Sequence, residues 1–242
     1  MTSSLSQKGI PVRERLIFAL DVPTVEEGKQ WVERLGDSVQ FYKLGLQFFM
    51  AGGYYEFIEY LHGLGKKVFA DLKFFDVPET VRLAVHQLKN RHVTFVTVHG
   101  NDAMLRAAAE AKNDMKILAV TVLTSLDQGD LNDLGFQCSI EDLVLSRARR
   151  ALQIGCDGVI SSGIEAARLR ADLGSNLLIV SPGIRPVINQ LADDQKRTVD
   201  LEDAFFNGAD YIVVGRPIRK ASDPRAKAEE MQGRIAKLFA GA

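Results

Sequence analysis

The sequence predicts a single (β/α)8 TIM barrel, and three observations support this prediction. Short apolar runs rich in β-branched residues alternate with amphipathic stretches at helical spacing. Runs such as 17–20 and 211–214 are apolar on both faces, which is typical of parallel strands in a sheet covered by helices. Eight such runs in 242 residues match the size of this fold. We expect one domain over residues 1–242, with residues 1–14 as an N-terminal extension. A doubly wound open sheet is the alternative that periodicity leaves open.

The expected elements follow from this alternation in chain order. The eight expected strands are the apolar runs 16–20, 40–44, 67–72, 94–98, 117–123, 158–161, 177–180 and 211–214. Between them we expect helices at 25–35, 48–64, 79–90, 103–111, 140–154 and 201–207, and a polar helix at 223–239 after the last strand. In the first helix, apolar or small residues recur at helical spacing, at Val25, Gly28, Val32 and Leu35. The wide interval after the fifth strand contains residues 127–137, which we expect to form a surface insertion.

Composition and charge exclude several classes of protein. Hydrophobic residues make up 46% of the chain and charged residues 25%, which excludes a largely disordered protein. The 30 basic and 31 acidic residues give a net charge of −1, so we expect no nucleic-acid partner. No apolar run approaches the roughly 18 residues of a membrane span, and residues 1–10 lack the apolar core of a signal peptide. Cys138 and Cys156 form neither a CxxC motif nor a disulfide framework, so we expect no nucleophilic role for them and a cytoplasmic location.

Charged side chains stand at the expected ends of three consecutive strands, where the active sites of such barrels lie. Asp21 and Lys43 end the first two strands. Asp71 and Lys73 end the third, and Asp76 follows in the loop. Residues two apart on a strand point to the same side, so we expect Asp71 and Lys73 to face the barrel interior together. Charges there are costly unless they are paired. A plain ion pair that ends the strand is the simpler interpretation, but the charges on the neighbouring strands weigh against it.

This charge pattern indicates catalysis by an ammonium group without a metal. Carboxylates on both sides of Lys73 would keep it protonated. A protonated ammonium held in a closed site can donate a proton or neutralise a developing carbanion. Two aspartates could instead hold Mg²⁺ with water completing the coordination shell, but an ammonium between them disfavours a cation. We therefore expect no metal and no cofactor.

Two glycine-containing turns follow the last two strands and indicate a phosphate site. Ser-Pro-Gly183-Ile-Arg185 follows the seventh strand, and Gly215-Arg216-Pro217 follows the eighth. Barrels commonly bind phosphate with these two loops and a helix N-terminus. Glycine lets backbone N–H groups approach an anion, and arginine binds phosphate oxygens in a bidentate way. Each sequence alone is an ordinary turn, but the two together favour phosphate binding.

In these motifs and others along the chain, the sequence resembles the orotidine 5′-phosphate decarboxylase family, in its short bacterial form, from Leu16 to the C-terminal helix. The run around Lys73 is highly specific, and the ordered set of motifs is more so. The motifs are Phe-Ala-Leu-Asp21, Tyr-Lys43-Leu-Gly, Asp71-x-Lys73-x-x-Asp76-x-Pro-x-Thr80, Thr-Val-Leu-Thr124-Ser, Ser-Pro-Gly-Ile-Arg185, Asp-Gln195-Lys-Arg and Val-Gly215-Arg216-Pro.

The resemblance implies a homodimeric, cofactor-free enzyme that converts orotidine 5′-monophosphate (OMP) into uridine 5′-monophosphate (UMP) and CO₂, the last step of de novo UMP synthesis. By resemblance, Lys73 donates a proton to C6 and Asp71 lies beside the scissile carboxylate. Asp76 and Thr80 enter the site of the partner subunit, Asp76 to extend the charged network and Thr80 to reach the ribose. The other substrate contacts that the resemblance implies are Asp21 and Lys43 at the ribose, Thr124 at the pyrimidine, and Gln195, Gly215 and Arg216, with Arg185 beside them, at the phosphate.

Two departures and two alternatives accompany this resemblance. Phe75 stands where the family commonly has histidine, and Glu79 where it has asparagine, at positions that carry no chemistry in the family pattern.

The nearest alternative is a Mg²⁺-dependent 3-keto-sugar-phosphate decarboxylase or hexulose-phosphate synthase of the same barrel group. Those enzymes typically carry an acidic residue where this chain has Lys43. A catalytically silent phosphate-binding barrel is the second alternative. Residues 186–196 are our candidate for a loop that closes over the substrate.

Overall fold

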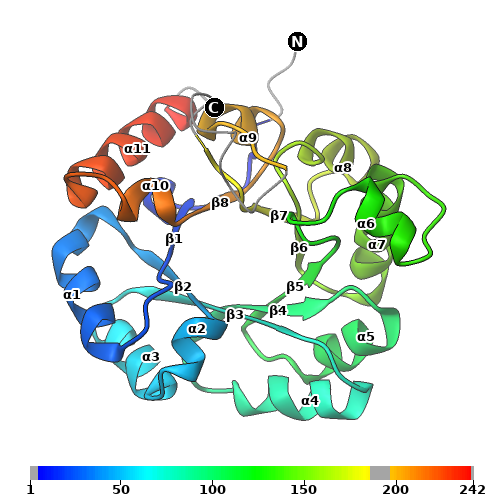
Figure 1. Ribbon diagram of the computed structural model, residues 1–242, viewed down its shortest axis with the longest axis horizontal. Helices are drawn as coiled ribbons and strands as arrows, with labels where there is room; N and C mark the ends of the chain where they lie inside the picture. Colours follow the sequence, from blue (N-terminus) through cyan, green and yellow to red (C-terminus); the bar gives the residue numbers. More distant parts are fainter. Residues whose placement is uncertain (1–4, 186–196, 241–242) are drawn as a thin grey trace.

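The computed structural model describes residues 5–185 and 197–240, which form a closed barrel surrounded by helices (Figure 1). Its parallel strands pair in chain order, and the last strand pairs with the first. The strands are β1 (Leu16–Ala19), β2 (Phe41–Gly45), β3 (Lys67–Phe74), β4 (Val93–His99), β5 (Lys116–Val120), β6 (Gly158–Ile160), β7 (Leu178–Ser181) and β8 (Tyr211–Val214). The prediction of a TIM barrel is confirmed, and the open sheet is excluded.

Helices cover the outside of the barrel, with at least one after each strand in the described part of the chain (Figure 1). The helices are α1 (Val25–Leu35), α2 (Leu46–Met50), α3 (Tyr54–Gly63), α4 (Pro78–Gln87), α5 (Asp102–Ala111), α6 (Gln128–Asp133), α7 (Ile140–Ile154), α8 (Ala166–Leu173), α9 (Leu201–Phe206), α10 (Arg216–Arg219) and α11 (Pro224–Phe239). No helix among the described residues has the length and apolar character needed to cross a bilayer.

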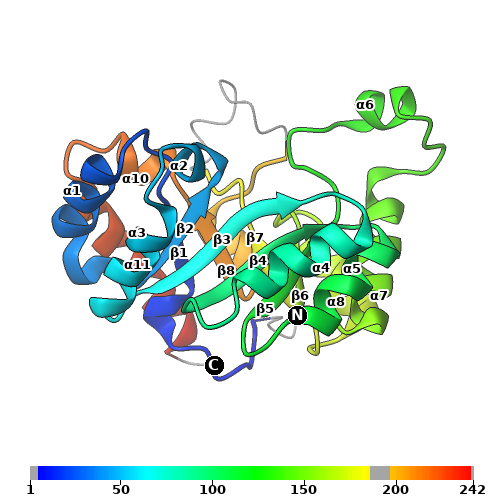
Figure 2. The ribbon, with the colours of Figure 1, turned by 90° about the horizontal axis from the view of Figure 1, so that it is seen from below.

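The predicted helix at 48–64 is wrong, because the chain forms α2 and α3 there instead. Gly52 and Gly53 separate them with φ angles of 80° and 64°, which are left-handed values that glycine adopts without steric cost. Helix α8 was not predicted, and the fifth strand was predicted to reach residue 123 although β5 ends at Val120. Residues 127–137 do contain an excursion from the barrel, and it includes the short helix α6 (Figure 2). The side chain of Asp127 caps α6 by accepting a hydrogen bond from Asp130 N–H.

Apolar side chains fill two layers, one inside the barrel and one beneath the helices. In the inner layer the rings of Phe41, Phe69, Phe95 and Tyr211 are buried, with centroids of contacting rings 5.0–6.0 Å apart. The barrel is therefore a packed core and not a pore. In the outer layer, strand residues that point away from the barrel axis pack against the helices. The polar groups of a site are consequently restricted to the barrel ends.

The N-terminal extension packs against the barrel end at which the strands begin. Asp210, directly before β8, is fully buried and accepts hydrogen bonds from Ser6 and Lys8 of the extension and from Arg170 of α8. Lys8 Nζ lies 2.7 Å from Asp210 Oδ2. These contacts close the lower end of the barrel, which leaves the carboxyl ends of the strands as the open end.

Candidate active site

A pocket opens at the carboxyl end of the barrel, where the sequence analysis expected the site. Residues that follow or end β1, β2, β3, β5, β6, β7 and β8 line it, so segments far apart in the chain meet there. The lining includes eight predicted site residues: Asp21, Lys43, Asp71, Lys73, Thr124, Arg185, Gly215 and Arg216.

The pleat of three adjacent strands places polar groups directly above the aromatic layer. Side chains two residues apart on a strand share a face, so each inward-facing ring is followed by an inward-facing polar group. The pairs are Phe41 with Lys43, Phe69 with Asp71, and Phe95 with Thr97. The charged groups therefore rest on a buried apolar floor, beside which electrostatic interactions are stronger than in bulk water.

The four strand-end charges form a continuous chain of alternating sign. Lys43 Nζ lies 3.0 Å from Asp21 Oδ1 and 3.5 Å from Asp71 Oδ2. Lys73 Nζ lies 2.9 Å from Asp71 Oδ1 and 3.0 Å from Asp71 Oδ2. The sequence prediction that these charges pair across neighbouring strands is thus consistent with the geometry. A plain ion pair confined to the end of β3 is excluded.

The same contacts fix the charge states of the two buried members of the chain. Burial by itself would lower the pKa of Lys43, but the carboxylates of Asp71 and Asp21 outweigh burial and raise that pKa above its ordinary value. Burial would raise the pKa of Asp71, but Lys43 and Lys73 outweigh it and hold that pKa below its ordinary value. Both groups are therefore charged at neutral pH.

The backbone at Lys73 departs from regular strand geometry. Its φ angle is 48°, a left-handed value that is uncommon for a residue with a side chain. The pairing register of β3 with β4 shifts between Ala70 and Phe74. Asp71 and Lys73 still line the pocket together, as expected for residues two apart, and Leu72 between them packs against the outer apolar layer.

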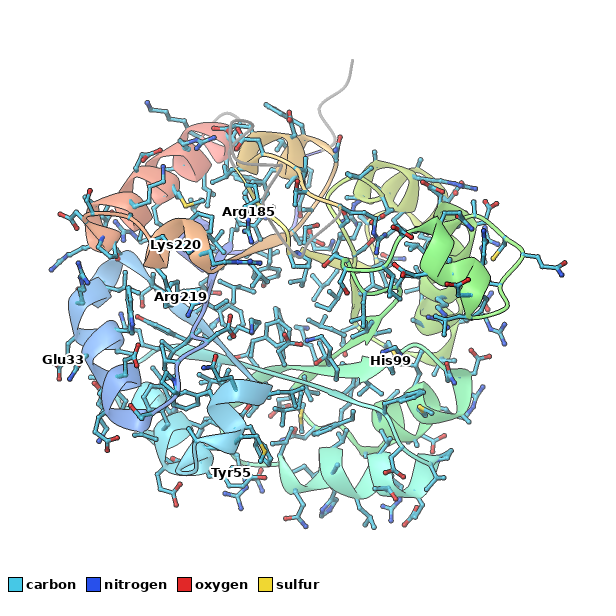
Figure 3. The ribbon with its side chains drawn as sticks, viewed as in Figure 1. Glu33, Tyr55, His99, Arg185, Arg219 and Lys220 are labelled. Carbon is cyan, nitrogen blue, oxygen red and sulfur yellow. The ribbon has the colours of Figure 1, made fainter. Side chains whose placement is uncertain are left out.

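Arg185, Gly215 and Arg216, which the sequence analysis expected at the phosphate, all line the pocket. Gly183 has a φ angle of 78°, which requires glycine in the turn after β7. A Cβ atom at Gly215 would lie 3.2 Å from Cβ of Ala19, so glycine keeps this part of the pocket open. Arg185, Arg216 and Arg219 line the same region, and Figure 3 shows Arg185 and Arg219 on the side of the barrel opening near β8 and α10. Three guanidinium groups and two glycines make this side suited to a phosphate dianion.

Two of the described predicted site residues, Asp76 and Thr80, do not line the pocket. Asp76 and Thr80 are exposed, and Asp76 Oδ1 accepts a hydrogen bond of 2.7 Å from the N–H of Val77. Gln195 and the predicted closing loop at 186–196 lie outside the described residues.

Three further residues, which were not predicted as site residues, shape the site. A Cβ atom at Gly45 would lie 3.1 Å from Lys43 Nζ and 3.4 Å from Asp21 Oδ1, so glycine leaves room for that ion pair. Arg219 lines the pocket and donates a hydrogen bond to the carbonyl of Asp21. Arg197 pairs with Glu165 and donates to the carbonyls of two pocket residues that follow β5. Two of them could have been found from the sequence. Gly45 stands two positions after the strand-end Lys43, and Arg197 stands two positions after Gln195.

The described residues contain no group of three or more His, Cys, Asp or Glu side chains that could hold a metal ion. At the position of a possible cation, between Asp21 and Asp71, the structure places the ammonium of Lys43. The donor set therefore does not fit Mg²⁺, and the charge of the two carboxylates is balanced by lysine instead.

Comparison with known proteins agrees with this geometry. The family model described as Orotidine 5'-phosphate decarboxylase / HUMPS family matches residues 14–231. The chain is 61% identical over 240 residues to the orotidine 5'-phosphate decarboxylase of Methylococcus capsulatus, covering 99% of both chains. It is 48% identical over 240 residues to that of Stenotrophomonas maltophilia, covering 98% of this chain and 99% of the relative. The crystal structure of orotidine 5'-phosphate decarboxylase from Lactobacillus acidophilus superposes with a TM-score of 0.81 and 34% identity, covering 92% of this chain and 99% of that one. These matches and the barrel fold agree, and the chain belongs to the orotidine 5'-phosphate decarboxylase / HUMPS family.

Proposed function

We propose that this protein decarboxylates OMP to UMP and CO₂ without a metal or an organic cofactor. The observation that supports this most directly is the Asp21–Lys43–Asp71–Lys73 chain, which holds an ammonium beside a buried carboxylate on an apolar floor. The two relatives described above are named for this reaction. Such an arrangement suits a reaction in which negative charge moves from a carboxylate to a carbon atom.

In the proposed reaction the bond between C6 and the carboxylate of OMP breaks, and CO₂ leaves. The bonding electron pair stays on C6, and Lys73 Nζ supplies the proton that forms UMP. Asp71 remains ionised because Lys43 and Lys73 hold its pKa down against burial. Its charge beside the substrate carboxylate would disfavour the ground state, and this repulsion is relieved as CO₂ departs. Lys73 Nζ lies 2.9 Å from Asp71 Oδ1, so in this proposal its ammonium stands beside the carbon atom on which the negative charge develops.

The rest of the pocket would hold the nucleotide away from the reacting carbon. In this proposal Asp21 and Lys43 bind the ribose hydroxyls and Thr124 contacts the pyrimidine. The phosphate contacts are assigned to Arg185, Gln195, Gly215 and Arg216. Support comes from their common location, because the described members of this set all line the same pocket. Binding energy from the distant phosphate can then contribute to closing the site and lowering the barrier.

We further propose a homodimer in which Asp76 and Thr80 complete the site of the partner subunit. Both side chains are exposed and outside the pocket of their own chain. Large apolar side chains are exposed near them and on α2, which follows the adjacent strand, and a second copy would cover this surface. These side chains are Leu46, Phe49, Met50, Phe75, Val77 and Leu83. We also propose a cytoplasmic location, which the free thiols Cys138 and Cys156 favour.

The Mg²⁺-dependent sugar-phosphate enzymes are the alternative, and Lys43 argues against them because it occupies the place of a metal ligand. The deciding experiment is turnover of OMP by the purified protein, with and without excess EDTA. We expect UMP and CO₂ to form at the same rate in both. Loss of activity in EDTA that Mg²⁺ restores would support the alternative. Binding of UMP without turnover of OMP would support a silent phosphate-binding barrel.

A further inference from the structure

Thr97 of β4 is a buried polar residue that the proposed reaction does not use. Its side chain is completely buried beside the charged chain. The Thr97 hydroxyl accepts a hydrogen bond of 2.9 Å from the backbone N–H of Lys73. It also donates a hydrogen bond of 3.0 Å to Oδ1 of Asp71. One side chain from the neighbouring strand therefore contacts both members of the central ion pair.

These two contacts determine which hydrogen bond the Thr97 hydroxyl accepts and which it donates. A backbone N–H only donates and an ionised carboxylate only accepts, so the hydroxyl must receive the first bond and give its proton to the second. Asp71 stays ionised because its pKa is lowered by the lysines despite burial. Thr97 thus fixes the backbone of Lys73 and the side chain of Asp71 at the same time.

The backbone of Lys73 requires such a contact. Its φ angle of 48° is costly for a residue with a side chain and persists only where surrounding contacts hold it. The register shift between Ala70 and Phe74 takes the strand out of the regular ladder at this point. The hydroxyl of Thr97 supplies the acceptor for the Lys73 N–H there. Without it, the partly buried N–H of Lys73 would lose this partner, and the backbone would tend to relax.

We propose that Thr97 is a positioning residue, whose hydroxyl holds Lys73 in the left-handed backbone conformation that places its ammonium on Asp71. This inference rests on the proposed function, because the aligned pair is the proposed proton donor and its neighbouring carboxylate. Thr97 does not line the pocket, so it acts through Asp71 and Lys73 and not by touching the substrate. Its loss should therefore affect the chemical step more than substrate binding.

The test compares Thr97→Val, which keeps the shape and removes the hydroxyl, with Thr97→Ser, which keeps the hydroxyl. Thr121→Val is the matched control, because Thr121 is also a fully buried threonine whose hydroxyl donates to a neighbouring strand, at 2.9 Å to the Ile160 carbonyl. We expect Thr97→Val to lower kcat for OMP by about 100-fold with KM changed less than about threefold. Thr97→Ser and Thr121→Val should keep kcat within about threefold of the wild type.

Crystal structures of the wild type and of Thr97→Val provide a measurement that does not depend on activity. We expect Lys73 to leave the left-handed region, and its ammonium to move off Asp71, in the variant only. If the wild type does not turn over OMP, the proposed function fails, but this structural comparison still tests the role of Thr97.

A kcat for Thr97→Val within threefold of the wild type would overturn the inference, as would an unchanged Lys73 backbone in its crystal structure. An equal loss of kcat in Thr97→Val and Thr97→Ser would also overturn it, because the hydroxyl would then be irrelevant. Should Thr97→Val fail to fold, Thr97→Ser and Thr97→Ala replace the pair, since they differ only in the hydroxyl. Equal kcat values in those two variants would refute the proposal.

Discussion

Replacing Lys43 by methionine should destabilise the protein by about 3 kcal/mol at neutral pH. Lys43 Nζ lies 3.0 Å from Asp21 and 3.5 Å from Asp71, and its side chain is 12% exposed. Unit charges 3.5 Å apart attract by roughly 5 kcal/mol at an effective dielectric constant of about 20, and desolvation offsets much of this attraction. Methionine removes the attraction but leaves both carboxylates in place. The expected cost is at the lower end of the range for a broken buried pair, because Asp71 retains Lys73 and the more exposed Asp21 can be hydrated.

The cost of this substitution should depend on pH. Burial raises the pKa of Asp71, but Lys43 and Lys73 outweigh burial and hold that pKa below its ordinary value. A carboxyl whose folded-state pKa is depressed stabilises the fold above its unfolded pKa, near 3.9, and this contribution is lost as the pH falls through the folded-state value. Without Lys43, burial has more weight and the folded-state pKa of Asp71 rises. The difference in stability between wild type and variant should therefore be largest near neutral pH and shrink below about pH 4.

The assay is urea unfolding of the wild type, Lys43→Met, Asp71→Asn and the double variant at one protein concentration. The double-mutant cycle should give a coupling free energy of about 2 kcal/mol. The control cycle is Lys227→Met with Glu230→Gln, an exposed pair on α11 at 2.7 Å, which should couple by less than about 0.5 kcal/mol. A coupling at the central pair as small as in the control, or a cost for Lys43→Met that does not change with pH, would refute this account of the charge chain.

Three further predictions concern the pocket and the partner subunit. Arg216→Ala should raise KM for OMP by roughly 30-fold, equivalent to about 2 kcal/mol for a lost charge-assisted phosphate contact. Variant and wild type should turn over phosphate-free orotidine at similar low rates, and a strong defect on orotidine would place Arg216 at the reacting end. Gly45→Ala should lower kcat by about tenfold without unfolding, because the new Cβ would lie 3.1 Å from Lys43 Nζ. Unchanged kinetics and thermal stability would show that the ion pair tolerates the methyl group. Mixing inactive Lys73→Ala with inactive Asp76→Ala should restore about a quarter of the wild-type activity after random subunit exchange, since a mixed dimer has one intact site. No recovery after exchange demonstrated by light scattering or labelling would argue that each site is built within one chain.

The order of elements could be predicted from the sequence because each depends on local periodicity. Both α1 and α7 have their predicted boundaries, and β8 matches its predicted range. The helix predicted at 48–64 shows the limit of this reasoning, since the apolar pattern continues through two glycines whose left-handed φ angles end one helix and begin another. The excursion after β5 was visible as a long interval, but its capped helix α6 is too short for a periodic signal.

Much of the candidate site could also be predicted, for a topological reason. In a closed parallel barrel all strands end at the same rim, so polar residues at predicted strand ends must lie near one another. This rule was enough to predict that four charged residues meet, namely Asp21, Lys43, Asp71 and Lys73. Arg216 was predicted because such barrels commonly bind phosphate after the last strand. The contact of Asp76 and Thr80 with a neighbouring site is a different case, because one chain leaves both residues exposed and only an assembled dimer tests it.

The sequence by itself determined the alternation of strands and helices, the charges at the strand ends and the glycines of the phosphate-side turns. These features depend on residue type and spacing along a few neighbouring positions. Only the tertiary structure decided how Lys73 meets Asp71, because the left-handed backbone at Lys73 is held by Thr97 from another strand, 24 residues away in the sequence. It likewise decided that Gly45 makes room for an ion pair whose members lie on β2 and directly after β1. At these points, contacts between distant segments stabilise a conformation that local preferences disfavour. A local sequence pattern therefore cannot predict them.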